Sequence, residues 1–493
     1  MPADLRVQLG GRISEGAQAR TLESLDGVRV IVRVGPSLHP LAATAGAVLF
    51  CLLARLHAHV TLDGDAPLGP NPWRIRRLSE MPDALAGVRP SPTREPVRTL
   101  IVGLGETAGP ADLFVGGGDW TARLAPEPQP LAPKRTGFGI QAAATLAAAE
   151  IAKMCLGPLG MIHHRIDGAL VWNLADYRLR PAREIEAPAP RSLAVLFFGG
   201  GSVGSSAIGA LLCVPDLEGF ASVVDPDTFD PSHNPHRYPI LTAGVGDSKA
   251  AWLARRLIAG GWHATAHPER VGSWVRGQVR PGFEGVAVSS VDRVDARLEV
   301  ADVLARTILS VGVAGSALHL QRECSFDEYA CPFCQFASLA SPLGQAEVYA
   351  AMTGLSPERV VQLVLGAPLR RADLEIAVSA AKLSAASADT LVGRRFEDLV
   401  RRAYAEAMVH PSRRPAAAPL TVSAPYVSWM AGVLVAAELV KAATSMPMID
   451  RRVDLDLSGI PGAAVRRVPR DAAGRCICAS PFRRRWARRL YER

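Results

Sequence analysis

The chain has 493 residues, of which 48% are hydrophobic and 21% charged, a globular composition that excludes a mainly disordered or collagen-like protein. This length predicts two or three domains with a large buried core. The 55 Lys and Arg residues exceed the 47 Asp and Glu residues only mildly, so a nucleic acid is not among the partners we expect.

No targeting segment stands out. The first 20 residues are polar and lack the apolar core of a signal peptide. The longest apolar run, 41–54, is shorter than the roughly 20 residues of a membrane span and predicts a buried helix. Eight cysteines are too few for a disulfide framework. We therefore expect a cytoplasmic protein with no membrane partner.

The first half, 1–180, contains hints of a duplicated domain. A candidate strand at 99–103 is followed by Gly105, but the next residues spoil the glycine pattern. A small-residue-rich helix predicted at 137–157 resembles another at 426–443, and both carry Ala-Ala-Glu with a Lys three residues after the Glu. The two alternatives are a chance match of Ala-rich helices and a first copy that lost its nucleotide site.

A linker at 181–192, rich in Pro, Ala and charge, separates this half from the second. The apolar run 193–198 predicts a buried parallel strand, and a second apolar run ends at Val224, so the order is β-α-β. The range 335–420 alternates helical patterns with polar breaks and predicts a helical insertion. The second domain is thereby divided into a nucleotide part at 193–334 and a remainder at 421–493. The basic tail of this remainder suits an acidic partner surface, a nucleic acid, or a solvated amphipathic helix that closes on the domain.

A glycine-rich turn follows the strand 193–198. Gly199, Gly201 and Gly204 satisfy G-x-G-x-x-G between a strand and a helix, and Gly200 stands at the first variable position. Such a turn lets backbone N–H groups approach a phosphate at the N-terminus of a helix. Asp225 closes the next strand, where a carboxylate accepts hydrogen bonds from ribose hydroxyls. The alternative for Asp225 is a purely structural role at the strand end.

The sequence after this turn carries more positively charged side chains than an NAD site needs. The chain has five Lys against 50 Arg, so Lys249 in a nucleotide domain stands out, and Arg237 precedes it. An Arg and a Lys suit a triphosphate, whose charge rises at the α-phosphate during nucleotidyl transfer, and two solvated surface cations are the alternative. Asp292, after a predicted strand at 286–291, would face the same crevice and could hold Mg²⁺.

These residues together resemble the E1-like superfamily, which includes ubiquitin-activating enzymes and the bacterial adenylyltransferases that activate sulfur-carrier proteins. The resemblance covers 190–335 and 420–480 and rests on the glycine turn, the D-x-D at Asp225 to Asp227, Arg237, Lys249, and Asp292 with Arg297. It implies an α/β fold with two Rossmann-like E1 adenylation domains, the first inactive and degenerate, together with the helical insertion and a zinc site.

The resemblance also implies roles for individual residues and the cofactors ATP and Mg²⁺. By position, the glycines and Asp227 bind the nucleotide, Asp225 contacts the ribose, Asp292 binds Mg²⁺, and three side chains contact phosphates: Asn234, Arg237 and Lys249. Two departures from the family pattern are present. His233 is inserted before Asn234, and Arg293 stands where the family has Asn.

The function implied is ATP-dependent adenylation of the C-terminal carboxylate of a ubiquitin-like protein. The tandem arrangement in an Arg-rich chain resembles the E1 proteins of bacterial ubiquitin-like conjugation operons linked to antiviral defence, so the acyl group would pass to the thiol of an E2-like partner. A homodimer is left open. The alternatives are an adenylyltransferase for a sulfur-carrier protein in thiamin or molybdopterin biosynthesis and a non-catalytic scaffold that kept the fold.

Two cysteine pairs predict a closed zinc site. Cys331-x-x-Cys334 and Cys476-x-Cys478 supply the four thiolates of a structural Zn²⁺ centre, although the family normally has a second CxxC where this chain has CxC. Thiols that merely pack in the core are the alternative.

Four other cysteines remain as acceptors for a thioester. Three of them lie in apolar or Ala-rich stretches predicted to be buried: Cys51, Cys155 and Cys213. Cys324 has a polar setting with Arg322 close in sequence, and it is the candidate catalytic cysteine. A free surface thiol, direct transfer of the acyl group to a partner's cysteine, and no transfer at all are the alternatives.

Overall fold

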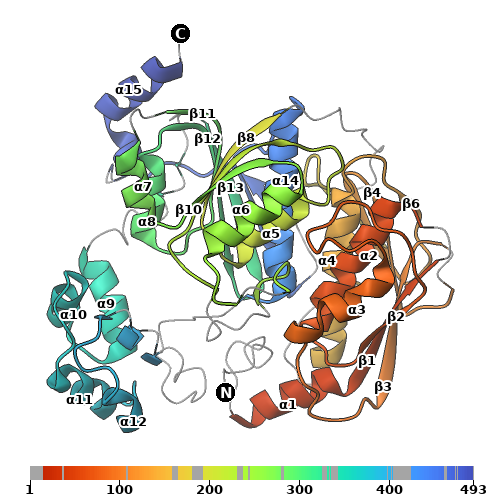
Figure 1. Cartoon of the computed structure of the whole chain (residues 1–493), viewed down its shortest axis with the longest axis horizontal. Coiled ribbons are helices and arrows are strands. Elements are labelled where there is room, and N and C mark those ends of the chain that lie inside the picture. Colours follow the sequence, from red (N-terminus) through yellow and green to blue (C-terminus); the bar gives the residue numbers. More distant parts are fainter. Residues whose placement is uncertain are drawn as a thin grey trace.

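The computed structural model describes residues 15–35, 38–106, 109–157, 165–179, 192–229, 237–242, 245–278, 282–324, 330–331, 333–334, 342–396, 398–400, 402–403, 423–459, 464–471, 474 and 476–491. Nearly all of the predicted linker 181–192, and Asn234 with the residues around it, lie outside these ranges. The described chain forms two β-sheets with helices between and around them, so the mixed α/β class expected from the sequence is confirmed (Figure 1).

The first sheet is built entirely from the first half. Its elements are α1 (Glu15–Asp26), β1 (Val28–Val34), α2 (Pro40–Ala54), β2 (Val60–Asp63), η2 (Leu78–Glu80), α3 (Met81–Ala84), η3 (Ala86–Val88), β3 (Arg98–Leu104), β4 (Leu113–Gly118), β5 (Thr121–Ala125), β6 (Leu131–Ala132), α4 (Phe138–Leu156) and β7 (Leu170–Asn173). The strands lie in the order β2-β1-β3-β4-β5-β7, with β6 paired to β4.

The second sheet is built from the second half. It begins with β8 (Leu193–Phe198), α5 (Ser202–Leu211), β9 (Gly219–Val224), α6 (Lys249–Ala259), β10 (His263–His267), α7 (Val271–Gly277), β11 (Phe283–Ser289), α8 (Val294–Ala301), β12 (Ala305–Ala314) and β13 (Ala317–Cys324). It is completed by α14 (Pro425–Ala443), β14 (Arg452–Asp456) and β15 (Ala464–Arg466). Its order is β10-β9-β8-β11-β12-β13-β14-β15, and the predicted strand 193–198 and the strand end at Val224 are confirmed.

Six strands of each sheet share one order and one set of directions. In the first sheet β1 runs parallel to β2 and β3, β3 parallel to β4, and β4-β5-β7 are antiparallel. In the second sheet β8 runs parallel to β9 and β11, β11 parallel to β12, and β12-β13-β14 are antiparallel. The resembling helices have equivalent places in chain order: α4 comes between β5 and β7, and α14 comes between β13 and β14.

The predicted strand 99–103 is confirmed within β3. The place of β8 in the strand order is taken by β1, which the sequence pattern did not single out. The reason lies in burial. β8 is apolar on both faces because the sheet is covered on both, whereas β1 alternates buried Val with more exposed residues such as Arg29, since only one of its faces is packed.

The core lies between the sheets. Side chains of α2, α4, α5 and α14 form one continuous apolar cluster with the facing strands of both sheets. The predicted buried helix at 41–54 is confirmed within α2. Two helices, α4 and α14, are long and apolar enough to cross a membrane, but 94% of each candidate window is buried inside this core.

The outer face of the second sheet carries a second apolar cluster, which joins α7 and α8 to the C-terminal helix α15 (Pro481–Tyr491) and to a group of cysteines. The described helices within the range 335–420 include α9 (Pro342–Thr353), α10 (Pro357–Val364), α11 (Arg371–Ser379) and α12 (Ala385–Ala388). These helices have a core of their own, and Figure 1 shows them as a separate group at the lower left.

Candidate functional site

The glycine turn joins the carboxyl end of β8 to the N-terminus of α5. Gly199 has φ +98°, which L side chains rarely adopt, and a Cβ on Gly204 would lie 2.0 Å from the carbonyl oxygen of Gly199. The N-cap of α5 is Gly201, which has no side chain to cap the helix, and a Cβ there would meet nothing within 4 Å. Among the described residues, the first N–H groups of α5 therefore have no side-chain cap, an arrangement that suits phosphate binding beside a tight turn.

Asp225 fastens this turn to the neighbouring strand. Its Oδ2 accepts a hydrogen bond from the N–H of Gly200 at 2.5 Å, and its Oδ1 accepts one from the N–H of Asp227 at 2.8 Å. Asp225 is 6% exposed. Burial raises the pKa of this carboxyl group, although Lys249 and the two N–H donors oppose that rise. Asp225 thus closes β9 and holds the turn, which is the structural role left open above, while a contact with ribose stays a prediction.

Lys249 begins α6 and lies buried beside the D-x-D. Its Nζ donates to Oδ2 of Asp227 at 3.0 Å, and its N–H donates to the carbonyl oxygen of Asp227 at 2.9 Å. Burial would lower the pKa of Lys249, but Tyr238, Asp225 and Asp227 raise it above its ordinary value. The structure therefore holds a permanent cation next to Asp225.

The third parallel strand, β11, contacts the turn directly. Ser290, which follows β11, donates its N–H to the carbonyl oxygen of Phe198 at 2.9 Å and its hydroxyl to that of Gly199 at 2.9 Å. Asp292 lies two residues further on, exposed, at the carboxyl edge of the same sheet. Because β9, β8 and β11 are adjacent and parallel, the structure brings Asp225, the turn and Asp292 to one edge.

Two arginines complete the charged surroundings. Arg237 lies next to Tyr238, whose ring centroid is 5.9 Å from Nζ of Lys249, and no described carboxylate forms an ion pair with Arg237. Arg297 donates to the hydroxyl of Ser310 at 3.0 Å and to the carbonyl oxygen of Val311 at 3.3 Å. Burial lowers the pKa of Arg297 to about 10, and the negative charge of Asp292 opposes this shift.

The site has a buried titratable residue nearby that the sequence analysis did not select. His319, on β13, lies beside Gly312, and burial together with Arg452 and Arg297 lowers the pKa of its imidazole to about 3. No pattern in the sequence marks His319, because a single His in a strand looks the same whether it is buried or exposed.

The first half contains a loop similar to the one that carries the D-x-D, and the described residues at the start of α2 cap that helix. β2 is followed by Gly64 and Asp65, and Asp65 accepts from Arg77 Nε at 2.6 Å and from the N–H of Ser79 at 2.9 Å. An isolated antiparallel bridge joins Pro67 to Arg77, as another joins Thr228 to Ser248 in the second half. At the start of α2, the imidazole of His39 accepts from the N–H of Leu41. This helix N-terminus is capped by its own chain.

The four cysteines of the two pairs converge. Cys331 Sγ lies 3.3 Å from Cys476 Sγ, Cys334 Sγ lies 3.4 Å from Cys478 Sγ, and all four sulfur atoms lie within 4.8 Å of one another. Sulfur atoms around a tetrahedral Zn²⁺, each at about 2.3 Å from the metal, are about 3.8 Å apart. The cluster can therefore hold a metal ion with four thiolates and no open position.

Outside this cluster, the three cysteines whose side chains the structure describes are buried. The thiol of Cys51 donates to the carbonyl oxygen of Pro239 at 3.1 Å, and that of Cys213 donates to the carbonyl oxygen of Gly209 at 3.3 Å. Burial raises the pKa of all three thiols, that of Cys155 to about 12. Cys324 ends β13, and its side chain lies outside the described part of the chain.

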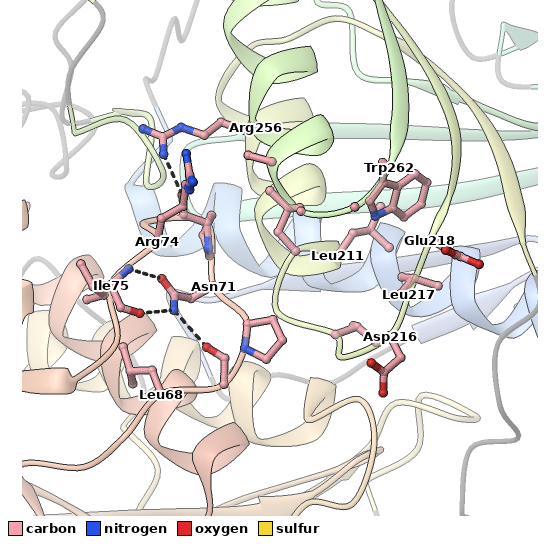
Figure 2. Close-up of a pocket in the computed structure, with 18 of the residues that line it drawn as sticks. Leu68, Asn71, Arg74, Ile75, Leu211, Asp216, Leu217, Glu218, Arg256 and Trp262 are labelled. Atoms are coloured by element: carbon pink, nitrogen blue, oxygen red, sulfur yellow. Dashed lines mark hydrogen bonds between the residues drawn. The ribbon is translucent and has the colours of Figure 1, made fainter.

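A cavity of about 790 Å³ lies at the other end of α5. It is lined by 68–76 of the first half and by 211–218 and 256–262 of the second, and Figure 2 shows Arg74 and Arg256 on one side of it and Asp216 and Glu218 on another. A helix of ten residues is about 15 Å long. The cavity is therefore separate from the glycine turn and makes no contact with Asp225 or Lys249.

Comparisons with known proteins give distant likenesses. No family model matches the chain. A protein of Sinorhizobium fredii named "Uncharacterized protein y4jF" is 25% identical over 460 residues, which are 88% of this chain and 86% of that protein.

Among solved structures, crystal structures of E. coli MccB with succinimide and with MccA-N7isoASN have TM-scores of 0.32 and 0.34 at 12% identity. The first match covers 57% of this chain and 65% of that chain, just under two thirds of its length, and the second covers 58% and 67%. The functional interpretation therefore depends on the site's own geometry.

Proposed function

We propose that the chain is an E1-like activating enzyme that uses ATP and Mg²⁺ to adenylate the C-terminal carboxylate of a ubiquitin-like protein. A carboxylate oxygen attacks the α-phosphorus of ATP, the bond to the β-phosphate oxygen breaks, and pyrophosphate leaves. A thiolate, which we assign to an E2-like partner, then attacks the acyl adenylate and displaces AMP.

The observation that carries the proposal is the joint placement of the open glycine turn, Asp225 and the buried Lys249. The turn supplies N–H donors for phosphate, and Asp225 lies where a ribose hydroxyl would bind. Lys249 adds a buried cation that an NAD site does not need. Nucleotidyl transfer raises negative charge on the phosphates, and a preorganised cation stabilises that charge.

ATP is held, in this proposal, by the turn, Asp225, Arg237 and Lys249, and Mg²⁺ by Asp292. The exposed Asp292 has free oxygen ligands of the kind Mg²⁺ prefers, at the same sheet edge as the turn. When bound, the metal neutralises phosphate charge. Asn234, which the resemblance places on the phosphates, lies outside the described residues and stays a prediction.

The shared strand order of the two sheets supports a duplicated adenylation fold. The second copy has an uncapped α5 behind three consecutive glycines, whereas His39 caps α2 in the first copy and Arg77 binds Asp65. These differences support assigning the nucleotide to the second copy alone. The boundaries 1–180, 193–334 and 421–493 are part of the same proposal.

Transfer to a partner's thiol is favoured by the burial of Cys51, Cys155 and Cys213, because a buried thiol with a raised pKa is a poor nucleophile. The four-cysteine cluster is proposed to hold Zn²⁺ in a structural role, since it leaves no ligand position open for chemistry.

The test is ATP–pyrophosphate exchange with candidate ubiquitin-like and sulfur-carrier proteins. Exchange that depends on a ubiquitin-like protein's free C-terminal carboxylate is expected, and Lys249→Ala should reduce it by about 10²–10³-fold. Exchange only with sulfur-carrier proteins would favour the cofactor-biosynthesis alternative, and no exchange with any carrier would favour a scaffold.

A further inference from the structure

The backbone segment that follows Arg237 is held by the first half of the chain. Three donors from that half converge on the carbonyl oxygen of Pro239: Cys51 Sγ at 3.1 Å, Arg55 Nη2 at 2.9 Å and Trp73 Nε1 at 3.3 Å. Arg55 Nη2 also donates to the carbonyl oxygen of Leu241 at 2.6 Å. One guanidinium therefore spans the two carbonyls and fixes the path of the backbone between them.

Arg55 is an unusual residue to find in this position. It directly follows α2, and its side chain is fully buried. A buried guanidinium is costly unless its N–H groups are hydrogen-bonded, so Arg55 holds its acceptors strongly. Its two carbonyl acceptors, on Pro239 and Leu241, are more than 180 residues away in sequence and belong to the other half.

The opposite side of the segment is fixed by the second half. A Cβ on Gly209 of α5 would lie 2.5 Å from Cγ2 of Ile240, so Ile240 fills the space that this glycine leaves. The ring of Tyr238 packs edge-on against Phe229, with centroids 5.1 Å apart, and lies near Nζ of Lys249. The segment is thereby clamped between the halves immediately after Arg237.

We propose that Arg55 is a positioning residue for the nucleotide site and acts through Arg237. This inference rests on the proposed function, in which Arg237 contacts the phosphates of ATP. With Pro239 and Leu241 fixed by Arg55, the backbone that carries Arg237 is already ordered before ATP binds. The first half then contributes to a site whose own ligands all lie in the second half, because preorganisation reduces the ordering cost of binding.

The experiment measures ATP·Mg²⁺ binding to the full-length chain by titration calorimetry in a double-mutant cycle of Arg55→Met and Arg237→Ala. Arg55→Met should weaken ATP binding about tenfold. In the Arg237→Ala background the same change should have no further effect, since Arg55 acts through Arg237. Binding of adenosine should not change, because it lacks the phosphates. Arg55→Lys, which can still donate to one carbonyl, should recover part of the affinity.

The matched control is Arg89→Met. Arg89 is half buried in the first half and donates to the carbonyl oxygens of Ala58 and Val60, away from the 237–241 segment. The Arg89→Met substitution should lower the melting temperature without changing the affinity for ATP. If Arg55→Met does not fold, Trp73→Phe removes one donor to Pro239 and keeps the ring that stacks on Trp429, and it should weaken ATP binding in the same direction.

The positioning role would be overturned if Arg55→Met weakened ATP binding equally in the wild-type and Arg237→Ala backgrounds. It would also be overturned if the Arg55→Met variant bound ATP like the wild type. A wild-type chain that binds no ATP would instead overturn the proposed function, and this inference with it.

Discussion

Lys153 and Lys441 occupy matching places on α4 and α14, and each reaches the opposite half of the chain. Lys153 Nζ donates to the carbonyl oxygen of Gly459 at 3.0 Å, and Lys441 Nζ donates to that of Leu174 at 2.8 Å. Each lysine also pairs with the Glu three residues earlier on its own helix. The Ala-Ala-Glu and Lys pattern seen in the sequence is therefore a reciprocal pair of anchors between the halves.

Breaking one anchor should destabilise the whole chain. In Lys441→Met, the carboxylate of Glu438 would remain fully buried with only Tyr177 and the N–H of Ile449 as donors. Removing one partner of a buried ion pair costs about 3–5 kcal/mol. The melting temperature should fall by several degrees, as measured by calorimetry.

The double variant Glu438→Gln with Lys441→Met should be less damaging than Lys441→Met alone, because it removes the uncompensated charge. The exposed Lys134→Met serves as the control and should leave the melting temperature nearly unchanged. If Lys441→Met melts like this control, the anchor does not stabilise the contact between the halves.

The cysteine cluster should bind one zinc ion per chain. Structural Zn²⁺ sites contribute about 10–16 kcal/mol of binding free energy in small domains, so chelation should lower the melting temperature. Cys331→Ser and Cys476→Ser should each reduce the metal content, since the cluster needs all four thiolates. Because α15 shares an apolar cluster with these cysteines, its proteolysis should also become faster. Full metal content and an unchanged melting temperature in both variants would show that the four-cysteine cluster is not the metal site.

His319 should make the folded chain less stable as the pH is lowered. Its pKa is about 3 in the folded chain, against 6.5 ordinarily, so the unfolded chain binds a proton between these values that the folded chain does not. The free energy of unfolding therefore falls as the pH drops below 6.5, by about 1.4 kcal/mol per unit from this residue.

The measurement is the melting temperature between pH 7.5 and 5 for the wild type and for His319→Gln, which cannot take up this proton. The variant should show a shallower decline towards low pH. Equal declines in the two proteins would mean that His319 titrates normally in the folded chain, despite its position between Arg297, Arg452, Asp454 and Arg466.

The acceptor thiol can be found on a non-reducing gel. With ATP and a ubiquitin-like protein but no E2-like partner, we expect no thiol-sensitive band of the enzyme joined to that protein, because the described cysteines outside the cluster are buried. A band that Cys324→Ala removes would assign the acceptor to Cys324. A band that survives Cys324→Ala would contradict both assignments.

The sequence predicted the parts of the site that lie close together along the chain. The run 193–198, the glycines after it and Asp225 form one β-α-β unit, whose pattern is local, and CxxC and CxC spacing similarly revealed the cysteine cluster. β1 was missed because a strand packed on one face alternates Val with Arg and does not look like β8. The link from Arg55 to Pro239 could not be predicted, because it joins residues 184 apart through a backbone carbonyl.

The most direct test of the central claim is the stoichiometry of ATP·Mg²⁺ binding. We expect one ATP per chain, loss of binding in Lys249→Ala, and full binding in Arg77→Ala, which alters the matching loop of the first half. Two ATP molecules per chain, or one that remains in Lys249→Ala and disappears in Arg77→Ala, would contradict the assignment of the nucleotide to the second half.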